Sequence, residues 1–278
     1  MSRGAAALLL ALLVAAGTAE ARPERVVSVN LCTDILTLLV AAPGQVASVT
    51  WLGADPDESP VADLAAGLAV NHGAAEEVMR LDADLVVAAD YSAQASLALL
   101  RRLGVPVVEV AVEDSVAGVV AALKTLGEAL GVPENAAAVV ARLNGGLARL
   151  AATAPGRGRT ALVYRTGGYV AARPGLIDHM LAALGLDNLA AARGFAAGTQ
   201  PSVEELLLAR PELLVVESYR PGVPSLAEAR LGHRALAALR DSAQVVAVPA
   251  PLWACPSPFI ADAAEAVADA LNAGDEPR

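Results

Sequence analysis

The chain has 278 residues, enough for two ordinary domains or one large one. Hydrophobic residues make up 55% of it, which supplies a large core, whereas charged residues make up 18% and the formal net charge is −10. This acidic balance argues against a nucleic-acid partner, which requires a basic face, and is typical of a freely soluble protein.

The first residues follow the order of a secretory signal peptide. Arg3 precedes an apolar run from Ala5 to Ala16, and Ala19-Glu20-Ala21 forms a cleavage pattern of small residues. The run is too short to span a bilayer, and no later stretch has about 18 uninterrupted apolar residues. We therefore expect removal of residues 1–21 and export of the mature chain. A buried N-terminal helix is the alternative.

From Arg25 onward, short Val-rich runs alternate with longer helical stretches rich in Ala and Leu. The patterns predict strands at 25–29, 46–50, 85–88 and 107–110, and helices at 33–41, 75–81 and 93–103. Short strands that are apolar throughout indicate a sheet covered on both faces. The fold class predicted is therefore α/β, with mostly parallel, Rossmann-like sheets.

Residues 115–152 lack any strand pattern. Helical periodicity on both sides of one break, Gly131-Val132-Pro133, predicts a long connecting helix over residues 136–150. The α/β pattern then starts again, with strands predicted at 161–164, 213–216 and 245–248, and helices at 176–184, 203–208 and 260–271.

The two α/β parts are similar in sequence. Residues 75–91 read AEEVMRLDADLVVAADY and match residues 203–219, which read VEELLLARPELLVVESY, under one constant shift. In both, two Glu open a short helix, an acid precedes a strand, and a Tyr follows it. The match predicts two related lobes, 22–114 and 153–278, joined by a helical segment at 115–152.

Aromatic residues are scarce and gather at one place in this pattern. Ligands of open parallel sheets bind at the carboxyl ends of the strands, and two lobes that face each other with such ends form a cleft. The chain has eight aromatic residues, and six of them lie at the ends of predicted strands or in the loops that follow: Trp51, Tyr91, Tyr164, Tyr169, Tyr219 and Trp253. Tyr and Trp combine a large contact area with a polar group, so the cleft suits a bulky, partly flat ligand. Structural packing at the strand ends is the alternative, chiefly for Tyr164.

Polar residues in the same loops add candidate ligand contacts. Arg165 and Arg220 suit carboxylates or other anionic groups, with solvated loop arginines as the alternative. His72 and Gln200 occupy equivalent positions of the repeat, which favours a polar ligand contact over a catalytic base. The further candidates are Asn30, Asn71 and Cys32.

No catalytic motif is present in the sequence. It contains no G-x-S-x-G elbow, no phosphate-binding Gly-rich loop and no H-E-x-x-H. His72 is a weak metal candidate, because metal sites need three or four converging ligands and only Asp55 and Asp57 are offered nearby. We expect neither catalysis nor a resident cofactor.

The two cysteines, Cys32 and Cys255, each follow a predicted strand, one in each lobe. Export favours a disulfide between them. Free thiols in or near the pocket are the alternative, because a bridge across the lobes would limit hinge opening.

Several segments resemble, in the same order, the periplasmic substrate-binding proteins for cobalamin, haem and iron-siderophores, which serve ATP-driven (ABC) importers. The opening RVVSVNLCTDILTLLVA is similar to that family's first strand, loop and helix, with Thr33-Asp34 in place of its T-E. EEVMRLDADLVVA and VEELLLARPELLVV resemble the family segment E-x-I-x-x-L-x-P-D-L-V. LLRRLGVPVVEV resembles its L-G-I-P-V segment.

This resemblance implies two α/β lobes, one rigid linking helix and a ligand in the cleft between them. It further implies that one exposed Glu on each lobe, Glu76 and Glu204 here, docks onto arginines of the importer's permease subunits. The expected protein is a periplasmic monomer that binds a metal chelate and meets the membrane only through the permease. Three alternatives remain: a protein of this fold that binds a bare divalent ion through His72 and acids, an exported enzyme on this scaffold, and a membrane-surface or adaptor protein with an empty cleft.

Overall fold

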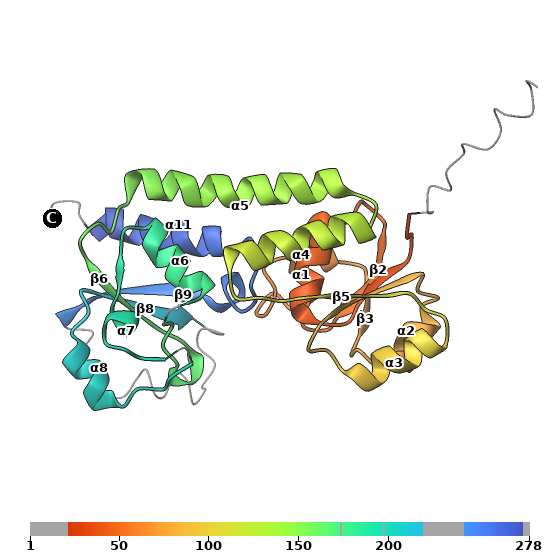
Figure 1. The fold of residues 1–278 in the computed structure, drawn as a ribbon, viewed down its shortest axis with the longest axis horizontal. Helices are drawn as coiled ribbons and strands as arrows, with labels where there is room; N and C mark the ends of the chain where they lie inside the picture. Colours follow the sequence, from red (N-terminus) through yellow and green to blue (C-terminus); the bar gives the residue numbers. More distant parts are fainter. Residues whose placement is uncertain (1–21, 173, 197, 219–241, 275–278) are drawn as a thin grey trace, which may run out of the picture.

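The computed structural model describes residues 22–172, 174–196, 198–218 and 242–274. It forms two lobes, each with a parallel sheet flanked by helices, and a long helix that runs along both (Figure 1). The predicted fold class is therefore confirmed. The expected signal peptide lies outside the described residues.

The first lobe contains a five-stranded sheet in the order β3-β2-β1-β4-β5, with every neighbouring pair parallel. Its strands are β1 (Val26–Ser28), β2 (Val46–Thr50), β3 (Ala69–Asn71), β4 (Leu85–Ala89) and β5 (Val107–Val110). Its helices are α1 (Leu31–Val40), η1 (Ala62–Ala65), α2 (Ala75–Arg80) and α3 (Gln94–Arg102). Strands β1 and β4 are buried along their whole length, which explains their apolar sequences. The sequence patterns missed β3, a short edge strand.

The second lobe contains a four-stranded parallel sheet in the order β7-β6-β8-β9 within the described residues. Its strands are β6 (Thr160–Tyr164), β7 (Asp187–Asn188), β8 (Leu213–Ser218) and β9 (Gln244–Pro249). Its helices are η2 (Thr166–Gly168), α6 (Leu176–Ala183), α7 (Leu189–Ala192), α8 (Val203–Ala209), η3 (Ala250–Leu252) and α11 (Ile260–Gly274). Strands β4 and β8, with the helices α2 and α8 before them, take the equivalent places that the sequence repeat implies.

Two helices connect the lobes, α4 (Val116–Ala129) and α5 (Pro133–Thr153). Helix α5 has 21 residues and so extends for about 30 Å. It packs on α1 and α4 of one lobe and on α6 and α11 of the other. Gly146 permits the close approach to α11, because a Cβ there would lie 3.1 Å from the Ala261 Cβ. One apolar core is therefore shared by both lobes and the connecting helices.

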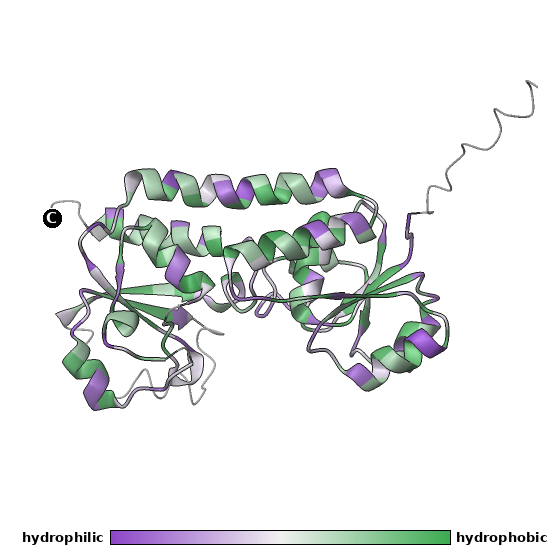
Figure 2. Cartoon of the chain, in the orientation of Figure 1, coloured by the Kyte–Doolittle hydropathy of each residue, from purple (hydrophilic) through white to green (hydrophobic). Residues whose placement is uncertain are grey.

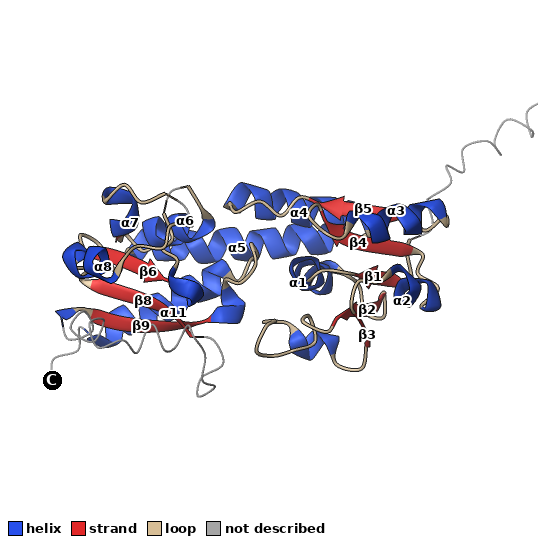
Figure 3. Cartoon of the chain, turned by 90° about the horizontal axis from the view of Figure 1, so that it is seen from below, coloured by secondary structure: helices blue, strands red, loops and turns tan. Residues whose placement is uncertain are grey.

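The carboxyl ends of the two sheets face the middle of the molecule. Seen from below, the strand arrows of both lobes point toward each other (Figure 3). The strands themselves are predominantly hydrophobic, and the polar residues lie mostly on the outer helix surfaces and in loops (Figure 2). Within the described residues, no helix combines the length and the apolar character needed to cross a bilayer.

A disulfide joins the lobes covalently. Cys32, in the first turn of α1, is bonded to Cys255, which follows η3, with their Cα atoms 5.3 Å apart and 223 positions between them in sequence. Both residues are buried beside Ile35 and Val61. Of the two alternatives for the cysteines, the structure therefore contains the disulfide.

Candidate ligand-binding site

A cavity of about 440 Å³ opens at the carboxyl end of the second sheet. The segment between β6 and α6 supplies most of its wall, and single residues of β8, α6, the loop before α8 and the β5–α4 loop of the first lobe supply the remainder. Its polar lining residues are Asp114, Arg165, Thr166, Tyr169 and Glu217. The cavity therefore lies where both lobes contribute side chains, and its size is within the usual range of small-molecule sites, about 300–1,000 Å³.

An ion pair forms one side of this cavity. Glu217, at the end of β8, is buried, and its Oε1 accepts from Arg165 Nη2 at 3.0 Å and from Arg165 Nε at 3.3 Å. Its Oε2 accepts from the Thr166 amide at 2.7 Å. Arg165 Nη2 also lies 3.4 Å from the Trp253 carbonyl oxygen. Arg165 lines the cavity as expected, but much of its charge is balanced by Glu217.

Asp114, at the end of the first lobe, forms a hydrogen bond with the start of α6 in the second lobe. Its Oδ1 accepts from the Leu176 amide at the start of α6, at 3.1 Å. Gly175 leaves room for this contact, because a Cβ there would lie 2.8 Å from Asp114 Oδ2. Asp114 thus caps a helix of the other lobe. Sequence reasoning did not select Asp114 or Glu217, although an acid directly after a fully apolar strand segment marks Glu217.

Three aromatic side chains at strand ends are strongly exposed. Tyr91 is 59% exposed, Trp51 48% and Tyr169 45%. Tyr91 follows β4, and its hydroxyl donates to Asn30 Oδ1 at 3.3 Å. Asn30 also caps α1 by accepting from the Cys32 amide. Exposed aromatic faces on both lobes are what the sequence pattern predicts for a bulky ligand.

Other predicted contacts have structural roles instead. Trp253 is only 4% exposed and packs in the shared core, so its indole faces no ligand space. Asn71, the last residue of β3, is fully buried and donates to the Ser28 carbonyl and the Ser48 hydroxyl. Cys32 is buried in the disulfide. These three residues are therefore left out of the ligand contacts proposed below.

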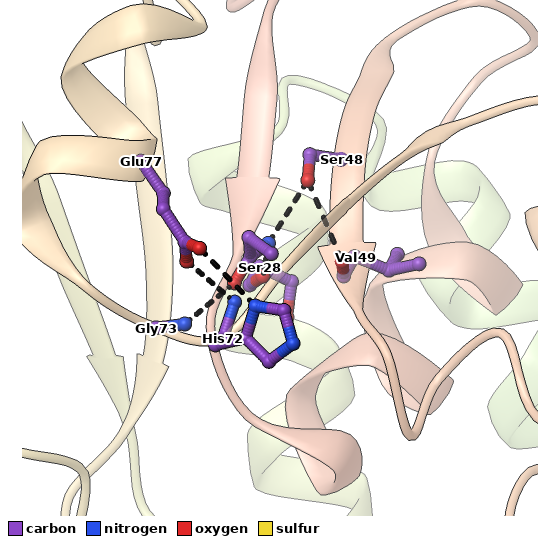
Figure 4. A network of polar contacts seen from close by, with 7 residues as sticks. Ser28, Ser48, Val49, His72, Gly73 and Glu77 are labelled. Carbon is purple, nitrogen blue, oxygen red and sulfur yellow. Dashed lines mark hydrogen bonds and ion pairs between the residues drawn. The ribbon is translucent and has the colours of Figure 1, made fainter.

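His72 lies on the surface beside the start of α2. Its side chain is 66% exposed, and its Nδ1 lies 3.1 Å from Glu77 Oε1, while its backbone amide donates to Glu77 Oε2 at 2.6 Å (Figure 4). These backbone and side-chain hydrogen bonds lower the pKa of Glu77. Across the described ranges, no three His, Cys, Asp or Glu residues converge to hold a metal ion.

The remaining predicted contacts divide between the second lobe and an undescribed segment. Gln200 Nε2 donates to the Gly167 carbonyl at 3.0 Å and so braces the turn that leads to Tyr169. Tyr164 is buried in the core of its lobe, as the packing alternative predicts. Tyr219 and Arg220 lie outside the described residues.

In each pair of Glu residues of the repeat, one side chain is bonded to the start of its helix and the other is exposed to solvent. Glu205 forms a capping box with Ser202 at the start of α8, and Glu77 serves the start of α2. Glu76 and Glu204 are exposed in the same first turns, and no ion pair links them to another described residue. Both helices lie on the side of the molecule away from α5 (Figure 1).

Comparison with known proteins identifies the family. The sequence model of the family described as "Periplasmic binding protein" matches residues 26–248, most of the chain. The chain belongs to the periplasmic binding protein family. No curated protein sequence matches it.

Solved structures with the same architecture include other periplasmic binding proteins. The haem-binding protein RhuT from Roseiflexus sp. RS-1, in its apo form, is 25% identical, with 89% of this chain and 99% of that chain covered and a TM-score of 0.69. The haem-binding protein HutB of Vibrio cholerae is 18% identical, with 89% and 98% covered and a TM-score of 0.73. The vitamin B12-binding protein BtuF of Vibrio cholerae is 19% identical, with 91% and 98% covered and a TM-score of 0.64. At these identities the last two support the shared fold alone.

Proposed function

We propose that this periplasmic binding protein captures a metal chelate, such as a corrinoid, haem or a ferric siderophore, and delivers it to an ABC importer. The observation that carries the proposal is the cavity at the carboxyl end of the second sheet, which Arg165 and Tyr169 line together with Asp114 of the first lobe. Trp51 and Tyr91 are exposed at strand ends of the first lobe and offer further aromatic surface. Aromatic faces pack well on flat macrocycles and on chelated organic ligands. The haem-binding protein RhuT, which is 25% identical to this chain, supports this ligand class.

The action is binding without turnover. Ion-paired Arg165 and the hydroxyls of Tyr91 and Tyr169 offer hydrogen bonds to polar groups on the rim of a chelate. The shared core, helix α5 and the disulfide hold the lobes together, so lobe movement on binding is small. The bare-ion alternative lacks a donor set in the described residues.

Delivery uses the two exposed acids Glu76 and Glu204. Each lies in the first turn of a short helix, and the two helices are on one side of the molecule (Figure 1). Two separated negative groups on one face suit a partner that presents arginines at a matching spacing. The partner proposed is the permease of the importer.

We expect export with cleavage after Ala21, and the first described residues are bonded to the first lobe. The Pro23 carbonyl accepts from Gln45 Nε2 at 2.9 Å, and the amides of Glu24 and Arg25 donate to Asp84. The chain is therefore fixed to the first lobe from the second residue after the expected cleavage site. Mass spectrometry of the exported protein should find Arg22 as its first residue.

A titration with haemin, cyanocobalamin and ferric hydroxamates tests the proposed function. Trp51 is the exposed indole, so its fluorescence should be quenched by the true ligand, and thermal stability should rise. The variant Trp51→Phe is the matched control, because it removes the reporter but leaves buried Trp253. Absence of both quenching and stabilisation with every chelate would contradict the proposal.

A further inference from the structure

A buried carboxylate lies beneath the turn that carries Trp51. Asp34, in the first turn of α1, is completely buried. Trp51 follows β2 directly and has about half of its surface exposed. An acid in a first helical turn is usually explained by the helix dipole. Here, however, the carboxylate bonds to the neighbouring turn and not to the amides of its own helix.

The contacts of Asp34 enclose the turn on both sides of Trp51. Asp34 Oδ2 accepts from the Thr50 amide at 3.1 Å and from the Thr50 hydroxyl. The same hydroxyl accepts from the Gly53 amide at 3.2 Å. Gly53 packs so closely that a Cβ there would lie 2.5 Å from Asp34 Oδ2 and 2.9 Å from Asp34 Cβ. One carboxylate oxygen thus fixes residues 50 and 53, between which Trp51 projects.

The backbone of Trp51 is fixed from the other side as well. Its amide donates to the Asn71 carbonyl at 3.0 Å. Asn71 is itself held by the Ser28 carbonyl and the Ser48 hydroxyl, part of the polar network shown in Figure 4. The backbone that carries the exposed indole is therefore held on both sides by polar groups that are buried and bonded to one another.

No described residue forms an ion pair with the buried carboxylate. Strands β1, β2 and β4, which pack on α1, contain no ionisable residue. Asp55, in the loop that continues the turn, is partly exposed. The charged residues of α4 and α5 are all exposed: Lys124, Glu128, Glu134, Arg142 and Arg149. Asp34 Oδ1 has no hydrogen-bond partner among the described residues.

This environment makes Asp34 a poor source of stability. An unpaired buried charge costs free energy, and burial raises the pKa of Asp34 to about 6, against the opposing effect of the Ser28 and Thr50 hydroxyls. Buried polar groups of this kind are retained where they specify one conformation of a site.

We propose that Asp34 is a positioning residue, which holds the 50–53 turn so that Trp51 is presented to the chelate in one fixed orientation. The proposal rests on the proposed function in one respect, that Trp51 contacts the ligand. The geometry of the turn can be tested without any ligand.

The test uses a Trp253→Phe background, in which Trp51 is the only indole. Thr50→Val removes both hydroxyl bonds, and Gly53→Ala pushes the turn away from the carboxylate. Asp34→Asn keeps an acceptor for Thr50 and serves as the conservative variant. Thr37→Val is the matched control, because Thr37 is buried one turn further along α1 and its hydroxyl bonds to no described residue.

Two readouts separate positioning from general stability. Acrylamide quenching of Trp51 in the folded, ligand-free protein should rise for Thr50→Val and Gly53→Ala, and remain near the parent value for Asp34→Asn. The Kd for the chelate identified by titration should rise about tenfold for the same two variants. Thr37→Val should change neither readout, even where it lowers the Tm.

The outcomes distinguish this inference from the proposed function. If the folded turn variants keep the parent's quenching and Kd while Trp51→Ala loses binding, the positioning role is wrong and the proposed function stands. If no chelate binds the parent protein, the proposed function fails, and the ligand-free quenching still decides whether Asp34 orders the turn.

Discussion

Within the described residues, each lobe buries one carboxylate near the carboxyl end of its sheet, but the two are supported in opposite ways. In the second lobe, Glu217 is paired with Arg165 and bonded to the Thr166 amide. In the first lobe, Asp34 is bonded to Thr50 and forms no ion pair with a described residue, and burial raises its pKa to about 6. The two related sheets therefore carry a loop over an ion-paired carboxylate in one lobe and a loop over an unpaired carboxylate in the other.

The two lobes share equivalent strands and helices but differ in the polar groups beneath their loops. The equivalent strands and helices, β4 with β8 and α2 with α8, set where the loops begin. The buried polar groups beneath each loop determine which hydrogen bonds hold that loop in place. The first lobe thus has a buried carboxylate with a raised pKa beneath its aromatic residue, whereas the second has a buried ion pair.

The largest change in stability should come from removing the disulfide between the two lobes. Replacing both Cys32 and Cys255 by Ser removes a cross-link between positions 223 residues apart. We expect the free energy of unfolding to fall by about 4 kcal/mol, because the unfolded chain gains conformational freedom. Urea unfolding measures the loss, and a reductant should reproduce it in the parent but leave the double variant unchanged. Equal stability of parent and double variant would show that the shared core alone holds the lobes.

The second largest effect should appear when Glu217 loses its partner. Arg165→Ala leaves a buried carboxylate unpaired, and we expect a loss of about 3 kcal/mol in urea unfolding. Arg101→Ala is the matched control: its pair with Glu109 is solvent-exposed, so the loss should stay below about 1 kcal/mol. Similar losses for the two variants would remove the distinction between a compensated buried pair and a surface one.

The third effect concerns the pH dependence of stability in the first lobe. The pKa of Asp34 is about 6 in the folded chain, above its ordinary value of 3.8, so the folded state binds more protons between these pH values. Its contribution to stability is therefore greatest below pH 4 and is lost as the pH rises through 6, by about 3 kcal/mol at most. Asp34→Asn should flatten this slope in unfolding curves measured from pH 4 to pH 7.

A control variant at an exposed carboxylate tests whether the pH dependence of stability comes from the buried Asp34. Asp84 is an exposed carboxylate that bonds the amides of Glu24 and Arg25, and Asp84→Asn should leave the slope between pH 5 and pH 7 in place. If Asp34→Asn also leaves it in place, the carboxylate is not the group that titrates.

The sequence predicted the frame of the molecule better than its site. Apolar strands buried on both faces, such as β4, and the helices that cover them have unambiguous patterns. The edge strands β3 and β7 were missed because they have only three and two residues, and most of β3 is exposed. Edge strands are held by backbone pairing to a neighbour, which leaves little trace in side-chain pattern.

The candidate site was predicted in part because exposure cannot be inferred from position along the chain alone. Trp51 and Trp253 both follow strands, yet the first is exposed and the second packs in the core. Asp114 was missed because its partner, the start of α6, belongs to the other lobe and lies 62 positions away in sequence. Contacts between distant segments depend on how the lobes pack, which local patterns do not record.

The smallest effect on the folded protein, and a large one on transport, is expected at the two exposed acids. Glu76→Arg combined with Glu204→Arg should change the free energy of unfolding by less than about 0.5 kcal/mol, because neither side chain is buried or paired with a described residue. Chelate affinity should stay at the parent value, since the binding cavity does not include either residue. Uptake by cells that carry the importer should nevertheless be lost, because like charges would then face the permease arginines. The matched pair Asp82→Arg with Glu212→Arg makes the same charge change at exposed acids beyond the far ends of α2 and α8, and should leave uptake largely intact. Equal uptake by both pairs would show that the importer does not recognise the first turns of α2 and α8.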